Sequence, residues 1–222
     1  MDKWVTWSEF VPFFKNEKNF FEFFFEKNFG GLTIDVSSLK QLIDDCSVPG
    51  PPAEYAYRPA CVFLLLYNKD EPYFLAIQKS DTEGYPWRNQ VALPGGHIEK
   101  FDASPIDAAY REVQEEVNIP RSQIEFIGSI GHYQTINDWD IQVFVGLWNG
   151  QGPVRYESAE ISRTLEIPVR EVLQTHVTNH YHGRIPDVSE LTYPFQDVVI
   201  WGVTARMLHH FIELIFPLLN NP

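Results

Sequence analysis

Residues Leu93–Ile119 read LPGGHIEKFDASPIDAAYREVQEEVNI and carry the strongest helix signals in the chain. Ser104 can cap a helix that has Pro105 at its first position, and Asp107 stands where the acid of a capping box belongs. Asn118 favours the left-handed conformation that ends many helices. Between these ends, apolar side chains recur at helical spacing and predict a stripe that faces a core: Ile106, Ala109, Val113 and Val117.

Acidic side chains fall off this apolar stripe. Glu112 and Glu116 are one helical turn apart, and Glu115 lies beside them. Because three neighbouring carboxylates repel one another, a hard divalent cation such as Mg²⁺ or Mn²⁺ would suit them. A solvated acidic helix face is the common alternative. Gly95-Gly96 ahead of the helix favour the metal site, since paired glycines let a backbone approach a ligand closely.

Arg111–Ile119 resembles the second half of the Nudix box, G-x5-E-x7-R-E-U-x-E-E-x-G-U, in which U is a bulky aliphatic residue. Every fixed position matches except Asn118, which replaces Gly. In the first half, the early acid counted from Gly96 falls on Asp102, and the gap to Arg111 is one residue longer than in the pattern. The longer gap resembles the coenzyme A pyrophosphatase branch, in which GG-x-x-D/E-x-x-D-x-S precedes the helix. The matching residues are Gly95, Gly96, Glu99, Asp102 and Ser104.

Other segments resemble the same branch. Leu75–Ser80 followed by Asn89–Gly96 is similar to L-L-T-x-R-S…G-Q-V-x-F-P-G-G, with Lys79 in place of Arg, Asn89 in place of Gly and Leu93 in place of Phe. Ile141–Gly146 is similar to V-T-P-F-V-G, and Trp201–Ala205 to the closing W-G-x-T-A. The departures concern the substrate branch and leave the hydrolase interpretation unchanged.

The resemblance implies an α/β/α Nudix sandwich, with a mixed sheet between the catalytic helix and the C-terminal helix. It also implies Mg²⁺- or Mn²⁺-dependent hydrolysis of a pyrophosphate bond in a nucleoside-diphosphate-linked substrate. Coenzyme A or an acyl derivative would give 3′,5′-ADP and 4′-phosphopantetheine. ADP-ribose or another nucleoside diphosphate derivative is the first alternative, and a catalytically silent nucleotide-binding module is the second.

The same resemblance implies roles for single residues. Glu112, Glu115 and Glu116 would hold the metal together with the Gly96 carbonyl, and Arg111 would orient the acids. Glu160 is a candidate general base, although an ordinary strand-edge acid is the simpler interpretation. The remaining candidates are substrate contacts: the cations Lys79, Arg58 and Arg88, the loop glycines Gly95 and Gly96, and Trp87, which could stack on a base or anchor its loop.

Charge, apolar content and cysteine content limit the kinds of partner and compartment that we expect. The 222-residue chain has a formal net charge of −13 and no basic run, so we expect a small nucleotide substrate and no nucleic-acid polymer. No stretch approaches about 18 uninterrupted apolar residues, and no signal pattern opens the chain, so we expect no membrane attachment. Cys46 and Cys61 give no disulfide framework and fit a reducing cytoplasm.

Residues 1–50 are expected to form an aromatic-rich helical extension, and residues 51–222 the Nudix hydrolase domain. The Phe- and Trp-rich runs before Gly30 predict two helices. A third helix is predicted to begin at Ser37 or Ser38, with Leu39, Leu42 and Ile43 on one face. These aromatics either pack on the main domain or form a lid or a homodimer surface.

The remaining elements of the domain follow from periodicity. We expect strands at Ala60–Tyr67, Tyr73–Gln78, Gln90–Leu93, Gln123–Gly131, Ile141–Trp148 and Tyr193–Trp201, and a final helix from Gly202 to about Leu219. The spacing of His176, His180 and His182 invites a zinc site. No further soft ligand is close in the sequence, so exposed loop histidines are the favoured interpretation.

Overall fold

The computed structural model describes residues 34–53, 56–84, 87–156 and 159–218. Within these ranges a seven-stranded sheet has the order β3-β2-β1-β6-β5, with β4 added to β1 and β7 added to β2. β1 (Arg58–Asn68) and β6 (Trp139–Trp148) are parallel, and the other neighbours are antiparallel. The predicted mixed α/β architecture is therefore confirmed.

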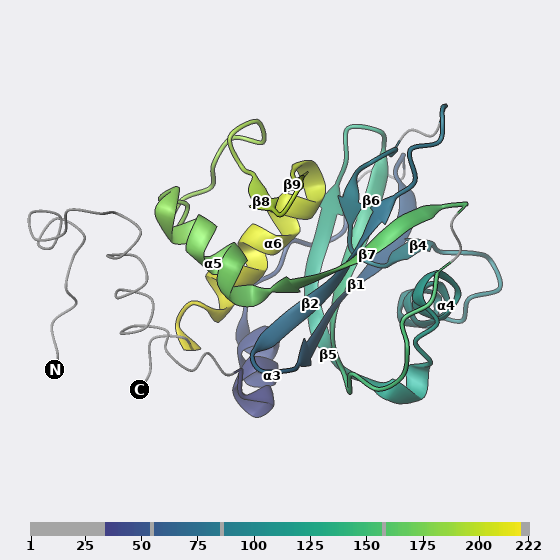
Figure 1. Ribbon diagram of the computed structural model, residues 1–222, viewed down its shortest axis with the longest axis horizontal. Coiled ribbons are helices and arrows are strands. Elements are labelled where there is room, and N and C mark those ends of the chain that lie inside the picture. The colour runs from purple at the N-terminus through teal and green to yellow at the C-terminus, as the bar shows by residue number, and fades with distance from the viewer. Residues whose placement is uncertain (1–33, 54–55, 85–86, 157–158, 219–222) are drawn as a thin grey trace, which may run out of the picture.

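The remaining elements complete this sheet, add a separate two-stranded sheet, and form the helical layers. The other strands are β2 (Pro72–Lys79), β3 (Val91–Ala92), β4 (Gly95–His97), β5 (Ile124–Gln134), β7 (Ile161–Pro168), β8 (Tyr193–Phe195) and β9 (Val198–Ile200). The helices are α3 (Val36–Asp45), α4 (Pro105–Val117), α5 (Val169–Thr178) and α6 (Gly202–Ile215), with a short 3-10 turn at Arg121–Gln123. Figure 1 shows α4 on one side of the sheet and α5 and α6 on the other.

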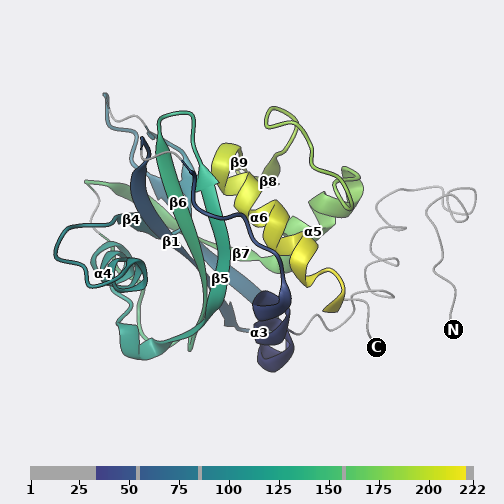
Figure 2. The ribbon, with the colours of Figure 1, turned by 180° about the vertical axis from the view of Figure 1, so that it is seen from behind.

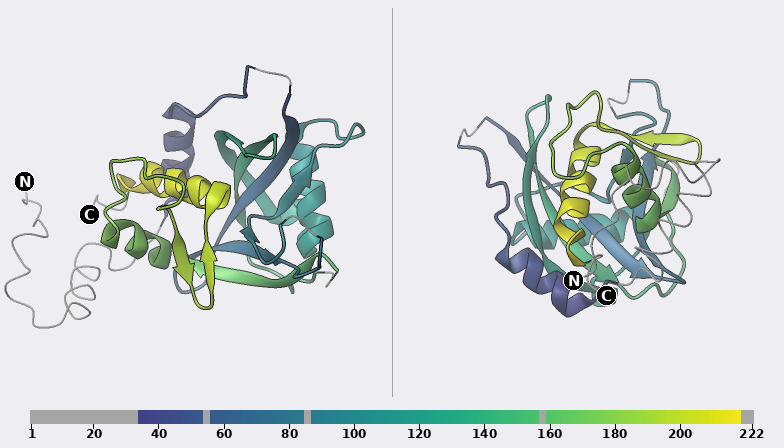
Figure 3. Two further views of the ribbon diagram at one scale, coloured as in Figure 1. Left: turned by 90° about the horizontal axis from the view of Figure 1, so that it is seen from above. Right: turned by 90° about the vertical axis from the view of Figure 1, so that its left-hand side faces the viewer.

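The continuous apolar run of β1 serves both faces of the sheet. Phe63 and Leu65 are fully buried in the core on the α4 side. Leu64 and Leu66 belong to the core on the opposite side. A strand covered on both faces has no solvent-facing positions to mark with polar residues, which explains the unbroken apolar sequence. The two layers also separate in the view from above (Figure 3).

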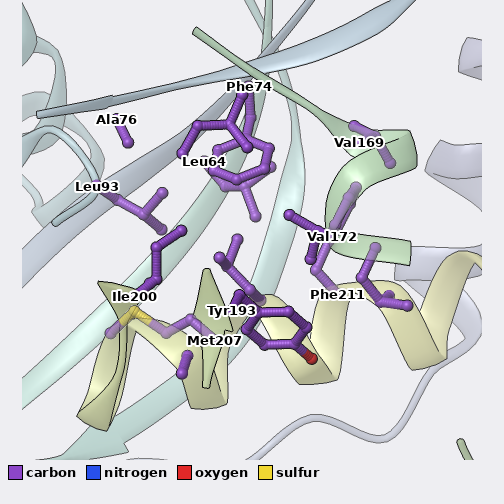
Figure 4. Packing of buried hydrophobic residues seen from close by; sticks show 14 of the residues in the cluster. Leu64, Phe74, Ala76, Leu93, Val169, Val172, Tyr193, Ile200, Met207 and Phe211 are labelled. Carbon is purple, nitrogen blue, oxygen red and sulfur yellow. The ribbon is translucent and has the colours of Figure 1, made fainter. Parts of the chain in front are cut away.

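The larger core lies between the sheet and α6. Leu64 and Phe74 from the sheet belong to the same buried cluster as Met207 and Phe211 from α6, as the close view in Figure 4 shows. The stretch Tyr193–Trp201, predicted to be one strand, is instead the hairpin β8–β9. Gln196 has a φ of 52°, and this left-handed residue turns the chain back on itself.

The third predicted helix is present as α3. It begins at Val36, slightly before the predicted start, because the Asp35 side chain caps it by accepting the Ser38 N–H at 2.7 Å. Leu39 and Ile43 are buried in the main core, and α3 lies beside β5 in Figure 2. The two helices predicted before Gly30 lie outside the described residues. The homodimer role and the boundary at residue 50 stay predictions.

The helix α4 follows its sequence signals closely. The Ser104 hydroxyl accepts the Asp107 N–H at 3.3 Å, Pro105 opens the helix, and Asn118 ends it with a φ of 57°. One expectation is wrong: Glu116 does not stand apart from the buried face but is itself buried.

The last helix, α6, is shorter than predicted. It ends at Ile215 rather than near Leu219, just before Pro217, which has no N–H to continue the hydrogen-bond ladder. Across the described ranges, the helices are too short or too polar to cross a membrane.

We predict that Ser104→Ala lowers the free energy of unfolding by about 1 kcal/mol, because the first turn of α4 loses its side-chain cap. Urea unfolding followed by circular dichroism measures the change. Ser122→Ala is the matched control, since Ser122 is exposed and caps no α-helix. Equal losses in the two variants would contradict the capping role.

Candidate active site

The strand β4 brings two glycines against β1 and α4. Gly96 pairs with Cys61, and a Cβ added to Gly96 would lie 2.5–2.8 Å from the carboxylate of Glu112. Gly95 has a φ of 147°, and a Cβ there would overlap the backbone carbonyl of Cys61. Both positions therefore require glycine, the first to make room for a carboxylate and the second for the backbone itself.

Glu116 is buried next to these glycines. One carboxylate oxygen accepts the Gly95 N–H at 2.8 Å, and the other lies 2.6 Å from Lys79 Nζ. The two side chains are only 8% and 12% exposed. Burial raises the pKa of Glu116, although Lys79 and the Gly95 N–H act in the opposite direction. Lys79 was predicted to contact substrate, and here its ammonium balances the charge of Glu116.

Arg111 connects three acids on this side of the sheet. Its guanidinium makes a two-bond contact with Asp102, at 3.0 and 2.9 Å. Its Nη1 lies 2.8 Å from Glu112 and 3.1 Å from Glu115. Asp102 is almost fully buried and also accepts the Glu99 N–H at 2.8 Å. Arg111 is therefore fixed by Asp102 and in turn fixes the orientation of the two glutamates.

The three glutamates of α4 have different environments. Glu112 is partly buried, and burial raises its pKa against the hydrogen bond from Arg111. The Glu115 side chain is 59% exposed. Among the described residues these three carboxylates do not form a group whose oxygens all lie within 4.8 Å of one another. Instead, Glu112 and Glu115 share Arg111, and Glu116 is held by Lys79.

Aromatic side chains gather at the other face of β4. The Trp139 ring stacks on His97, with centroids 4.3 Å apart and planes at 2°, and Trp87 meets Trp139 at 6.2 Å. The Arg58 guanidinium lies 4.1 Å from the centre of the Trp139 ring. Consecutive residues of a strand face opposite sides, so Gly96 contacts the acids while His97 contacts the aromatic group.

The other predicted site residues are Arg58, Arg88 and Glu160, and each has its own contacts. Arg58 also donates to the Asn137 carbonyl at 2.8 Å. Arg88 pairs with Asp81 at 2.6 Å, and both side chains are about half exposed. Glu160 is exposed at the start of β7, and its carbonyl accepts the Ser80 N–H at 2.8 Å. Within the described ranges the Glu160 carboxylate forms no ion pair.

Three residues of this region were not among the predicted site residues: Asp102, His97 and Trp139. Asp102 had a signal, because it is the early acid of the box, and its contact with Arg111 explains why an acid is needed there. His97 had none, since its position depends on the pairing of β4 with β1. Trp139 is the first residue of β6, and its partners Arg58 and His97 come from the separate strands β1 and β4, so only the folded sheet brings the three together.

Comparison with known proteins places these features in a family. The sequence model of the NUDIX domain matches residues 57–186. The chain is 30% identical over 175 residues to a Photorhabdus laumondii protein named uncharacterized Nudix hydrolase NudL, covering 75% of this chain and 90% of that protein. The Escherichia coli K12 protein of the same name is 30% identical over 155 residues, covering 68% and 80%.

Solved structures show weaker likeness. The NUDIX domain of Shewanella oneidensis NrtR, complexed with ADP ribose, is 20% identical, with a TM-score of 0.45 and coverage of 62% of this chain and 91% of that one. The Ap4A hydrolase of C. elegans, in a binary complex, is 18% identical, with a TM-score of 0.44 and coverage of 53% and 84%. The sequence matches are sufficient without them: this chain belongs to the Nudix hydrolase family.

Proposed function

We propose that this Nudix hydrolase cleaves the pyrophosphate bond of coenzyme A or of an acyl derivative, releasing 3′,5′-ADP and 4′-phosphopantetheine. The observation that carries the hydrolytic part is the burial of Glu112 and Glu116 beside Gly95 and Gly96. A solvated acidic helix face would not bury its carboxylates. The coenzyme A part rests on the segments that resemble that branch, which extend from Leu75 to Ala205.

The donor atoms of this site suit a hard cation. Nudix hydrolases generally use divalent metal ions. The carboxylates of Glu112 and Glu116, with Glu115 from the exposed side and the Gly96 carbonyl, would hold Mg²⁺ or Mn²⁺ through oxygen alone. When bound, such an ion would neutralise charge on the pyrophosphate and lower the pKa of a bound water.

The remaining charged residues position these ligands. Arg111, anchored by Asp102, fixes the orientation of Glu112 and Glu115. Lys79 balances the charge of buried Glu116. Glu160 is the proposed general base: its carboxylate is exposed at the start of β7, next to the segment that carries Lys79, and would accept a proton from the attacking water.

The aromatic group suits the nucleotide half of the substrate. Trp87 and Trp139 offer ring surfaces for a base, and Arg58 brings a positive charge to the same group. A coenzyme A substrate also carries a phosphate on its ribose. Arg88 is the cation proposed to meet it, because its exposed pair with Asp81 is worth about 0–1 kcal/mol and is readily given up.

A second candidate substrate is ADP-ribose or another nucleoside diphosphate derivative. The observation that favours it is the engagement of Lys79, the residue at the Arg position of the coenzyme A signature, with buried Glu116. A cation held in this way does not offer its charge to a distant ribose phosphate. A catalytically silent nucleotide-binding module is the third candidate, and the intact Glu112, Glu115 and Glu116 disfavour it.

We predict that the purified protein with Mg²⁺ or Mn²⁺ releases 3′,5′-ADP from coenzyme A and acetyl-coenzyme A faster than it releases AMP from ADP-ribose. Chromatography of the products from a substrate panel measures this. AMP from ADP-ribose with coenzyme A left intact would assign the second candidate. Binding of these nucleotides without hydrolysis of any would assign the third.

We predict that Glu116→Gln lowers turnover by at least about 100-fold, or about 2.7 kcal/mol of activation free energy, because a charged ligand becomes neutral at constant size. Steady-state kinetics with Mg²⁺ measures the loss. Glu125→Gln is the control, since Glu125 is an exposed acid on β5. The double variant Glu116→Gln/Lys79→Met separates stability from activity. Removing the ammonium that loses its carboxylate partner in Glu116→Gln should restore the free energy of unfolding, whereas turnover should stay low.

Substituting Gly96 is predicted to affect activity, whereas substituting Gly95 is predicted to affect stability. Gly96→Ala should lower activity at least about tenfold with little change in melting temperature, because the side chain of Glu112 can move away and lose its position. Gly95→Ala should lower the free energy of unfolding by about 1–3 kcal/mol, because it meets fixed backbone in a left-handed conformation. Gly50→Ala, with open space around it, is the control. Equal effects at Gly95 and Gly96 would contradict this assignment.

A further inference from the structure

A second polar cluster lies between α5 and α6, on the opposite side of the sheet from α4 (Figure 1). His176 comes from α5, and His209 and Glu213 come from α6. One ring nitrogen or carboxylate oxygen of each lies within 4.8 Å of the others. His176 is fully buried, His209 is buried, and Glu213 is partly exposed. None of these residues takes part in the proposed hydrolysis.

The residue spacing along α6 and the direction of the His176 side chain bring these three side chains together. His209 and Glu213 are four residues apart in α6 and so share one face of the helix. His176 Nε2 lies 2.6 Å from Glu213 Oε1 and therefore points toward that face. Its Nδ1 lies 2.9 Å from the Tyr193 hydroxyl. Metal-binding histidines commonly have an outer hydrogen-bond partner of this kind on the second nitrogen, which fixes the ring.

His182 lies outside this three-residue group, at its solvent side, and is the candidate for a fourth ligand. His182 Nδ1 lies 3.0 Å from the same oxygen of Glu213, and the His182 side chain is half exposed. Its ring stacks on Phe216 with centroids 3.8 Å apart. The Gly183 N–H donates to both carboxylate oxygens of Glu213. The cluster is therefore preorganised from the loop after α5 and is reachable from solvent through His182.

His176 does not fit the prediction of exposed loop histidines. His176 is a buried helical residue and not an exposed loop histidine, and His180 is exposed and outside the cluster. The ligands that were missing near His176 come from α6, more than thirty residues later in the chain.

We propose that His176, His209 and Glu213, with His182 as fourth ligand, form a second metal site that takes Zn²⁺ or a similar transition-metal ion. Two or three imidazole nitrogens and one carboxylate suit zinc and are unlike the all-oxygen set of α4. A tetrahedral zinc with bonds of about 2.0–2.1 Å separates its ligand atoms by roughly 3.3 Å. The contacts of Glu213 with His176 and His182, at 2.6 and 3.0 Å, are shorter than that spacing, so the side chains would separate by roughly 0.3–0.7 Å to admit the ion.

The bound ion would connect α5 and its following loop to α6, and would stabilise the layer that packs on the sheet. The competing description is a metal-free hydrogen-bond network of the same residues.

The test uses the full chain carrying Glu112→Gln and Glu116→Gln, so that the α4 site does not contribute. After removal of bound metal by a chelator, Co²⁺ is added and its visible absorption recorded, and Zn²⁺ affinity is measured by competition with a chromophoric chelator. We expect about one ion per chain, with an intense tetrahedral cobalt spectrum, and a higher melting temperature with Zn²⁺.

Substitutions in the same background assign the ligands. Glu213→Gln and His209→Asn should each weaken Zn²⁺ binding at least about tenfold, and His182→Ala should change the cobalt spectrum, while His180→Ala should match the parent protein. Circular dichroism checks the fold of each variant. Absence of Zn²⁺ binding by the folded Glu112→Gln/Glu116→Gln parent would overturn the proposal, as would affinity unchanged in Glu213→Gln and His209→Asn. Failure here would leave the hydrolase proposal untouched, because the α4 residues are scored by turnover.

Discussion

The arrangement of this domain depends on two carboxylates, buried Glu116 and partly buried Glu112, that lie against Gly95 and Gly96. An ionised carboxylate inside a protein is strongly unfavourable unless it is paired and hydrogen-bonded. Here Glu116 has Lys79 and the Gly95 N–H, and Glu112 has Arg111. Each partner comes from a different part of the chain: β2, β4 and α4. The position of α4 on the sheet is thus set by charge compensation as well as by its apolar stripe.

The acidic side chains and the aromatic side chains of this region lie on opposite faces of β4. On the α4 side lie the acids, fixed by the salt bridge between Arg111 and Asp102. At the other face of β4, Trp139 stacks on His97 beside Arg58. Two consecutive residues of one short strand, Gly96 and His97, connect these regions. The proposed substrate, a pyrophosphate with a base at one end, would use both regions, the charged centre for the pyrophosphate and the ring surface for the base.

The elements that were predicted correctly are those whose sequence signals are short-range. The cap at Ser104, the end of α4 at Asn118 and the two-sided burial of β1 each depend on neighbouring residues or on a single period. The burial of Glu116 and the pairing of Lys79 could not be predicted, because they depend on β2 and α4 meeting in space. The β8–β9 hairpin was missed for a local reason, since Gln196 is an unusual residue for a left-handed turn.

The replacement at position 79 shows why a family signature need not report on substrate alone. The coenzyme A signature has Arg where this chain has Lys79, and from the sequence alone that difference concerns substrate recognition. In the fold, the ammonium of Lys79 lies against buried Glu116, in contact with a proposed metal ligand. A compact ammonium meets one carboxylate oxygen there, whereas a planar guanidinium would present a wider fork with several donors. The substitution therefore changes the electrostatics of the proposed metal position directly. Its effect on substrate choice would be indirect, through the charge left at that position.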